Sequence, residues 1–109
     1  PPARLFARLL ADTVTARTNM VVLSSVQSIA DPSATLAGEL RRFGLDATRR
    51  EAVVVYDAAL TPAGKDNVVK RRFEAHVPIG AIDAANAGPA LSNAANRVAG
   101  EVATWVAAN

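Results

Sequence analysis

The chain contains no cysteine, which excludes disulfides, thiolate nucleophiles and zinc sites built on cysteine. Aromatic residues are also scarce, at 5% of 109 residues, although half of the chain is hydrophobic. No apolar run approaches the roughly 18 residues that a membrane-spanning helix needs. Neither charge sign dominates, since 12 Lys and Arg stand against 10 Asp and Glu. We therefore expect one small domain with a core of Val, Leu and a few rings, and no polycationic nucleic-acid binder.

The N-terminal third begins with helical periodicity. Apolar residues recur at helical spacing and predict a helix over residues 2–17, with prolines where a first helical turn tolerates them. The β-branched run Met20–Leu23 predicts a short buried strand, and residues 24–33 are expected to be a connection. The chain does not start with Met, so we expect it to be a trimmed or processed piece of something longer.

The middle of the chain predicts an antiparallel β-meander. Three strands are expected at residues 35–43, 52–60 and 68–77, with turns at 46–49 and 61–66. Placing Leu60 opposite Asn67 puts Val54 opposite Phe73, Asp57 opposite Lys70 and Glu51 opposite His76. Placing Leu40 opposite Val54 puts Gly38 opposite Tyr56, whose ring could cover the missing side chain. The expected buried face comprises Leu36, Leu40, Val54, Tyr56, Val69 and Phe73.

The C-terminal segment predicts a second helix. Asp83 is expected to cap a first short turn, and Gly88-Pro89 to interrupt the chain before the main helix. One apolar stripe follows at helical spacing: Leu91, Ala94, Ala95, Val98, Val102, Trp105 and Val106. The expected fold is a single α+β domain over residues 1–109, a two-layer sandwich with the N-terminal and C-terminal helices packed on one face of the meander.

The inventory of reactive side chains predicts a protein that is not an enzyme and holds no metal or cofactor. His76 is the only histidine, and no carboxylate lies near it at a metal-ligand spacing. Gly64-Lys65 lacks the second glycine and the hydroxyl of a phosphate-binding loop, because Ala59 and Asp66 stand at those positions. The serines lack the strand-turn-helix elbow of hydrolases.

The basic residues form clusters that leave two interpretations open. The candidate contacts for an anionic surface are Arg41, Arg42, Arg49, Arg50, Lys70 and Arg72, which the expected registers bring toward one end of the meander. They could meet lipid headgroups. Alternatively, they solubilise a strand face on which they alternate with Glu39, Glu51, Asp57 and Glu74.

The order helix, three strands, helix also occurs in double-stranded RNA-binding domains. Such domains present lysines at the start of the last helix to reach phosphates. Residues 88–96 contain no lysine here, so no nucleic-acid partner is expected. An RNA-binding or protein-binding module remains the alternative function.

One strand carries a motif that resembles a known family. The segment Leu36–Gly44 reads LAGELRRFG, with Leu36, Glu39, Leu40 and Phe43 at the spacing of the ABC-type transport auxiliary lipoprotein family, whose C-terminal aromatic falls on Trp105. The chain departs from that family at Ala34-Thr35, where an aromatic-Arg pair is frequent. It also lacks the N-terminal third of the family, with the lipidated cysteine and the first strands.

The resemblance implies a function that the spacing alone does not. It implies a periplasmic lipoprotein, membrane-anchored through a lipidated N-terminus absent from this chain. Its implied partners are an ABC permease, an ATPase and an MCE-type protein, with possible lipid contact, in a system that moves lipid between membranes. Because the family's first strands are missing, we expect an open strand edge at Met20–Leu23 or on one side of the meander, and possible homo-oligomers through that edge.

Overall fold

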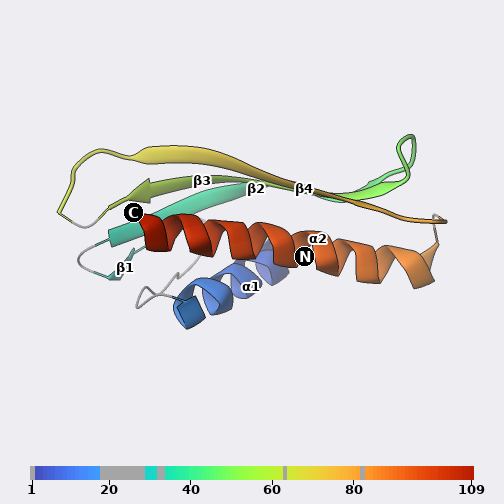
Figure 1. Ribbon diagram of the computed structural model, residues 1–109, viewed down its shortest axis with the longest axis horizontal. Coiled ribbons are helices and arrows are strands. Elements are labelled where there is room, and N and C mark those ends of the chain that lie inside the picture. Colours follow the sequence, from blue (N-terminus) through green and yellow to red (C-terminus); the bar gives the residue numbers. More distant parts are fainter. Residues whose placement is uncertain (1, 18–28, 32–33, 63, 82) are drawn as a thin grey trace.

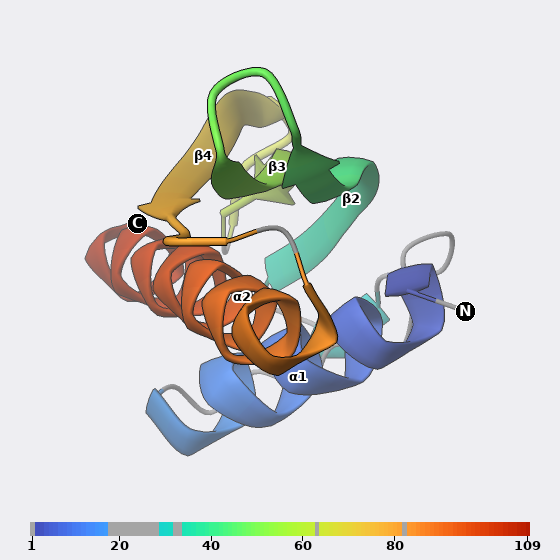
Figure 2. The same ribbon diagram turned by 90° about the vertical axis from the view of Figure 1, so that its right-hand side faces the viewer.

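A four-stranded antiparallel sheet with two helices on one of its faces forms the domain (Figures 1 and 2). The computed structural model describes residues 2–17, 29–31, 34–62, 64–81 and 83–109. The elements are α1 (Pro2–Arg17), β1 (Ile29–Asp31), β2 (Ala34–Asp46), β3 (Glu51–Thr61), β4 (Val69–Pro78) and α2 (Ala84–Ala108). The strands lie in the order β1-β2-β3-β4. The predicted α+β sandwich with an antiparallel meander is thereby confirmed.

The N-terminal part agrees with the sequence in its helix and contains one short strand that the sequence does not predict. The bounds of α1 match the predicted helix over residues 2–17. The strand expected at Met20–Leu23 lies outside the described residues. Three residues of the expected connection form β1, which pairs with the start of β2 through Ile29 and Thr35.

Helix α1 buries one stripe of side chains against α2 and the sheet. Phe6, Leu10 and Val14 are four residues apart and all buried, as one face of a helix requires. The Phe6 ring lies 5.1 Å from the Tyr56 ring on β3, centre to centre. Figure 2 shows α2 under the β4 side of the sheet and α1 beside it.

Helix α2 is longer than the sequence predicts. Oδ1 of Asp83 accepts a hydrogen bond of 2.9 Å from the N–H of Asn86, so the expected cap is present. The expected interruption at Gly88-Pro89 is wrong, because the helix runs through Pro89 without ending. Pro89 removes one backbone hydrogen bond. The buried face that starts at Ala90 keeps the helix continuous despite that loss.

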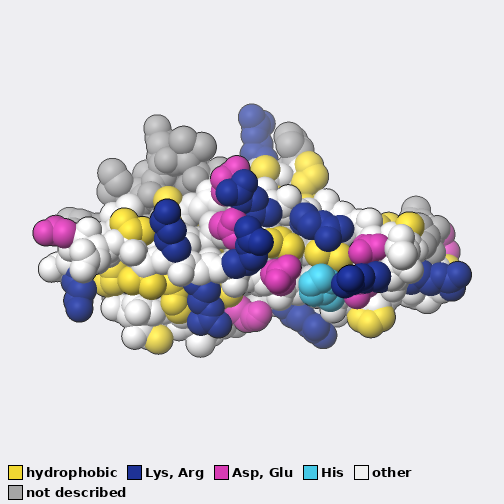
Figure 3. All heavy atoms as spheres, turned by 90° about the horizontal axis from the view of Figure 1, so that it is seen from above, with side chains coloured by type: hydrophobic (Ala, Val, Ile, Leu, Met, Phe, Trp, Pro, Cys, Tyr) yellow, Lys and Arg dark blue, Asp and Glu magenta, His cyan; other side chains and the backbone are white. Residues whose placement is uncertain are grey.

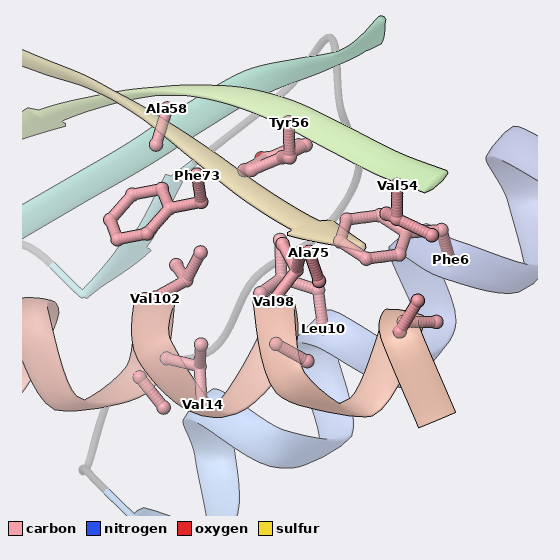
Figure 4. Packing of buried hydrophobic residues seen from close by; sticks show 14 of the residues in the cluster. Phe6, Leu10, Val14, Val54, Tyr56, Ala58, Phe73, Ala75, Val98 and Val102 are labelled. Atoms are coloured by element: carbon pink, nitrogen blue, oxygen red, sulfur yellow. The ribbon is translucent and has the colours of Figure 1, made fainter. Parts of the chain in front are cut away.

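The core lies between α2 and the inner face of the sheet, the face toward the helices (Figure 4). Val98 and Val102 of α2 point toward Val54, Tyr56 and Phe73 of the sheet. Alanines at positions 94, 95, 99 and 103 are all buried, and their small size lets α2 approach the sheet and α1 closely. The predicted stripe therefore packs on the sheet, with Leu91 and Trp105 partly buried at its margins.

The register between β3 and β4 differs from the predicted one by two residues. Leu60 lies opposite Val69, not Asn67, and Tyr56 lies opposite Phe73. The connection is longer than expected because the N–H of Lys65 donates to the carbonyl oxygen of Pro62 at 3.1 Å, and residues 66–68 stay outside the ladder. A shift of two residues keeps every side chain on its predicted face.

The β2–β3 hairpin shows the same two-residue difference from Leu36 to Leu40 and a three-residue difference from Arg42 to the turn. Leu40 lies opposite Tyr56 instead of Val54, and Gly38 opposite Ala58. The turn is wider than expected because Oδ1 of Asp46 accepts from the N–H of Arg49 and Arg50 adopts a φ of 52°. The Tyr56 ring still covers Gly38, because it reaches diagonally across the pair.

A β-bulge at Arg41 interrupts the alternation of β2. Pairing passes from Leu40–Tyr56 to Arg42–Val55, which leaves Arg41 without a directly opposite residue. Leu36 and Leu40 are separated by an even number of residues, whereas Leu40 and Phe43 are separated by an odd number. The bulge therefore lets Leu36, Leu40 and Phe43 all pack toward the helices.

One residue of the expected buried face is misplaced. Val69 is 39% exposed, because it is the first residue of β4 and lies at the end of the sheet. The other expected members are buried or packed against the core.

The packing of Tyr56 on Gly38 predicts a large effect of a single methyl group. A Cβ at Gly38 would lie 2.6 Å from the carbonyl oxygen of Asp57 and closer still to the Tyr56 ring. We expect Gly38→Ala to lower the free energy of unfolding by about 1–3 kcal/mol, measured by urea denaturation. Gly44→Ala on the same strand is the matched control, because nothing lies within 4 Å of its Cβ position. Equal stabilities of the two variants would contradict this packing.

The burial of Tyr56 predicts a shifted titration. Burial raises the pKa of Tyr56 to about 12, against roughly 10 in the unfolded chain. Its contribution to stability is therefore complete below pH ~10 and is lost as the pH rises from ~10 through ~12. Tyr56 is the only tyrosine, so near-ultraviolet absorbance of tyrosinate reports it alone. A folded-state midpoint equal to that of the urea-unfolded chain would show that the ring is not buried.

Candidate functional site

Charged side chains cover the outer face of the sheet, the face turned away from the helices (Figure 3). The registers arrange them in rows across three strands. One row joins Glu39, Asp57 and Arg72, and the neighbouring row joins Ala37, Ala59 and Lys70. Cations and anions are interspersed over this face, and we call these charged side chains the lattice.

Asp57 is the centre of this lattice. Nε of Arg72 donates to its Oδ1 at 2.6 Å, and Nε of Arg41 donates to its Oδ2 at 2.8 Å. Arg41 also lies 3.4 Å from the Glu39 carboxylate. The hydrogen bonds from Arg72 and then Arg41 hold the pKa of the Asp57 carboxyl well below its usual range. The predicted partner of Asp57 was Lys70, and the two-residue register difference replaces it with Arg72.

The middle of β3 is buried under this lattice. Val53 and Val55 point to the outer face, yet only 1% and 4% of their surfaces are exposed. Val55 lies between Arg42 and Glu74 in its row. The aliphatic stems of long charged side chains can cover apolar surface while their heads stay in water. β3 is therefore buried on both faces.

His76 belongs to the same face. Its Nδ1 lies 2.8 Å from Oε1 of Glu51, and its Nε2 lies 3.9 Å from Oε1 of Glu74. Glu51 and His76 meet diagonally, since their direct partners are Pro78 and Val53. Within the described ranges, no group of three or more His, Cys, Asp or Glu side chains could hold a metal ion.

The candidate anionic-surface contacts do not gather at one end of the meander. Arg49 and Arg50 lie at the turn after β2, about 20 Å from Asp57 along β3 at about 3.3 Å per residue. Arg41 and Arg72 are bound to Asp57. Among the described residues, no acid forms an ion pair with the exposed side chains of Arg42, Arg49, Arg50 and Lys70.

A shallow hollow interrupts the lattice. Small residues, Ala37 and Ala59, form its floor, and Lys70, Arg72 and Glu39 stand at its rim. Its volume is ≈ 530 Å³. Charged side chains form its rim. Among the described residues, no buried side-chain nitrogen or oxygen lacks a hydrogen-bond partner.

A second hollow follows the gap between β4 and the C-terminal half of α2, and we call it the β4–α2 groove. Its walls carry Arg71 and Phe73 from β4 and Arg97, Glu101 and Trp105 from α2. The Trp105 ring meets Phe73 edge-on, with centres 5.4 Å apart, and the Arg71 guanidinium lies 5.0 Å from the Phe73 ring centre. The groove has a volume of ≈ 610 Å³.

Sequence reasoning missed this groove. It placed Trp105 in the apolar stripe that packs on the sheet and did not include Arg71 among the candidate contacts. The available signal is the alternation of β4, because Arg71 and Phe73 are two residues apart and therefore share a face.

A smaller apolar hollow lies between the helices near Phe43, toward the end of β2. It is lined mainly by Leu5, Leu9, Phe43 and Leu91, and its volume is ≈ 300 Å³. Leu5 is 68% exposed at its rim. The described helices include none that is long and apolar enough to cross a membrane.

Comparison with known proteins adds two findings. Residues 1–103 match the family of ABC-type transport auxiliary lipoprotein components. The fold is similar to the crystal structure of protein XCC0632 from Xanthomonas campestris, assigned to family DUF330, with a TM-score of 0.60 and 27% sequence identity. That similarity covers 67% of this chain and 45% of the other, so this chain spans less than half of that protein. No curated protein sequence matches.

Proposed function

The chain belongs to the ABC-type transport auxiliary lipoprotein component family, and from this premise we propose that it is a non-catalytic periplasmic subunit of a system that moves lipid between membranes. The match over residues 1–103 carries the proposal. The expected partners are an ABC permease with its ATPase and an MCE-type protein. The lipid anchor that the family name implies would hold the domain at a membrane surface.

The surfaces of the domain support a binding role. The outer face is an ion-pair lattice centred on Asp57, and its single histidine is engaged by Glu51. Charged side chains keep a sheet face soluble. At an interface, charge complementarity contributes more to the choice of partner than to the affinity for it. The β4–α2 groove and the apolar hollow near Leu5 offer surfaces for other polypeptides.

We propose that Arg49 and Arg50 are the cations that meet anionic headgroups. They lie together at the exposed tip of the β2–β3 hairpin, whereas Arg41 and Arg72 are bound to Asp57. An exposed cation near an anionic leaflet contributes about 1 kcal/mol to membrane attachment. Arg42 and Lys70 extend the same charge along the outer face.

Genetic epistasis in the source organism tests the function. Deletion of the gene should alter the lipid composition of the membranes in the same way as deletion of the ATPase gene of the same system. The double deletion should be no more severe than either single deletion, because both proteins serve one route. Additive defects would contradict a role in that route.

Complementation of the deletion strain tests the role of the hairpin tip in the same assay. The variant Arg49→Gln, Arg50→Asn should restore the lipid composition less fully than the wild type, and asparagine keeps the left-handed backbone of position 50 accessible. The matched control is Arg4→Gln, Arg8→Gln on α1, which removes the same charge from an exposed helix face. Equal complementation by the two variants would remove the hairpin tip from the proposal.

A further inference from the structure

β4 is the last strand of the sheet, and its edge away from β3 has no strand beside it in the described part of the chain. β4 pairs only with β3 there, and it is ten residues long. A strand edge of this length exposes a row of backbone N–H and C=O groups that another extended segment can pair with.

One hydrogen bond identifies which backbone groups face that edge. The N–H of Ile79 donates to the carbonyl oxygen of Arg50 at 3.0 Å, which makes 50 and 79 a hydrogen-bonded pair. Such pairs alternate along an antiparallel ladder, so Val77, Ala75 and Phe73 also bond to β3. The N–H and C=O groups of Lys70, Arg72, Glu74 and His76 therefore point to the open edge. Pro78, which has no N–H, occupies the next position of this series.

The β4–α2 groove lies beside the same edge, on the face toward the helices. A strand added to β4 would place alternate side chains in this groove, next to Phe73 and the partly exposed ring of Trp105. Backbone pairing at an edge combined with a side-chain pocket under it is a common mode of peptide recognition.

The charge beside the edge favours an acidic occupant. Lys70, Arg71 and Arg97 are exposed and form no ion pair with an acid among the described residues. Arg71 and Arg97 line the groove, and Glu101 is the acid that lines it with them. A second copy of β4 would bring its own Lys-Arg-Arg run to this surface, so another copy of the chain fits less well than an acidic segment.

We propose that an extended acidic segment of a partner polypeptide adds to β4 as a further strand, with an apolar side chain in the β4–α2 groove and carboxylates facing Lys70, Arg71 and Arg97. The proposed strand addition is argued from the open edge of β4 and the β4–α2 groove of this chain. The assignment of the partner to a transport system rests on the proposed function.

A synthetic peptide of about eight residues, a central valine flanked by aspartates, is the probe. Its binding to the purified chain should slow hydrogen exchange at the amides of Lys70, Arg72 and Glu74 and change the fluorescence of Trp105, the only tryptophan. The variant Glu74→Pro removes one outward N–H without removing a hydrogen bond to β3. We expect it to weaken binding about tenfold or more, whereas Glu74→Gln binds as the wild type does.

Charge reversal provides a second, independent variant. Arg71→Glu, Arg97→Glu should weaken the acidic peptide about tenfold and favour a matched peptide with lysines in place of the aspartates. The control Arg4→Glu, Arg8→Glu changes net charge equally on α1 and should leave binding unchanged.

Two results with peptide would overturn the proposal: unchanged hydrogen exchange at the outward amides of β4, or equal binding by the Glu74→Pro and Glu74→Gln variants. A third would be found without peptide. It is self-association of the chain in light scattering together with slowed hydrogen exchange at the same amides. None of these readouts involves the transporter. Failure of the epistasis test with intact peptide binding would remove the proposed function and leave the strand-addition site.

Discussion

The bulge at Arg41 is the constraint on which both faces of the sheet depend. Leu36, Leu40 and Phe43 must all reach the helices, yet their spacings of four and three residues cannot fit one uninterrupted alternation. One extra residue in β2 resolves the conflict. The same residue places two consecutive arginines on the outer face, where Arg41 joins Arg72 on the Asp57 carboxylate. The bulge thus determines both the packing of β2 on the helices and the position of Arg41 on the outer face.

This arrangement limits where the described part of the domain can bind other molecules. β3 is buried on both faces, with α2 on one side and the charged side chains of the outer face on the other. The ion pairs at Asp57 and Glu51 occupy much of the charge of the outer face. The described residues offer the hairpin tip with Arg49 and Arg50, the apolar hollow near Leu5, and the open edge of β4 above the β4–α2 groove. A domain built in this way suits an auxiliary component that joins other subunits.

The sequence predicts the faces of the elements better than their pairing. Periodicity places α1, the three long strands and the stripe of α2 correctly, because the spacing of apolar residues indicates which face of an element is buried. The registers differ by two or three residues, since they depend on the turn geometry around Asp46 and Pro62 and on the bulge at Arg41, which spacing does not contain. The continuity of α2 through Pro89 depends on tertiary burial from Ala90 onward. The β4–α2 groove could not be predicted from spacing, because Arg71 and Trp105 both contact Phe73 only as a result of the packing of α2 on β4.

Deletion of single residues from β2 tests the central claim most directly. Removing Arg41 deletes the extra residue, so Leu36, Leu40 and Phe43 can all face the helices in a regular strand. Removing Ala37 instead puts Leu36 out of phase with Leu40. The account predicts that the chain without Arg41 keeps a cooperative urea transition and the β2–β3 pairing seen by NMR, whereas the chain without Ala37 loses both. Equal loss of structure in the two deletions would contradict the role assigned to the bulge.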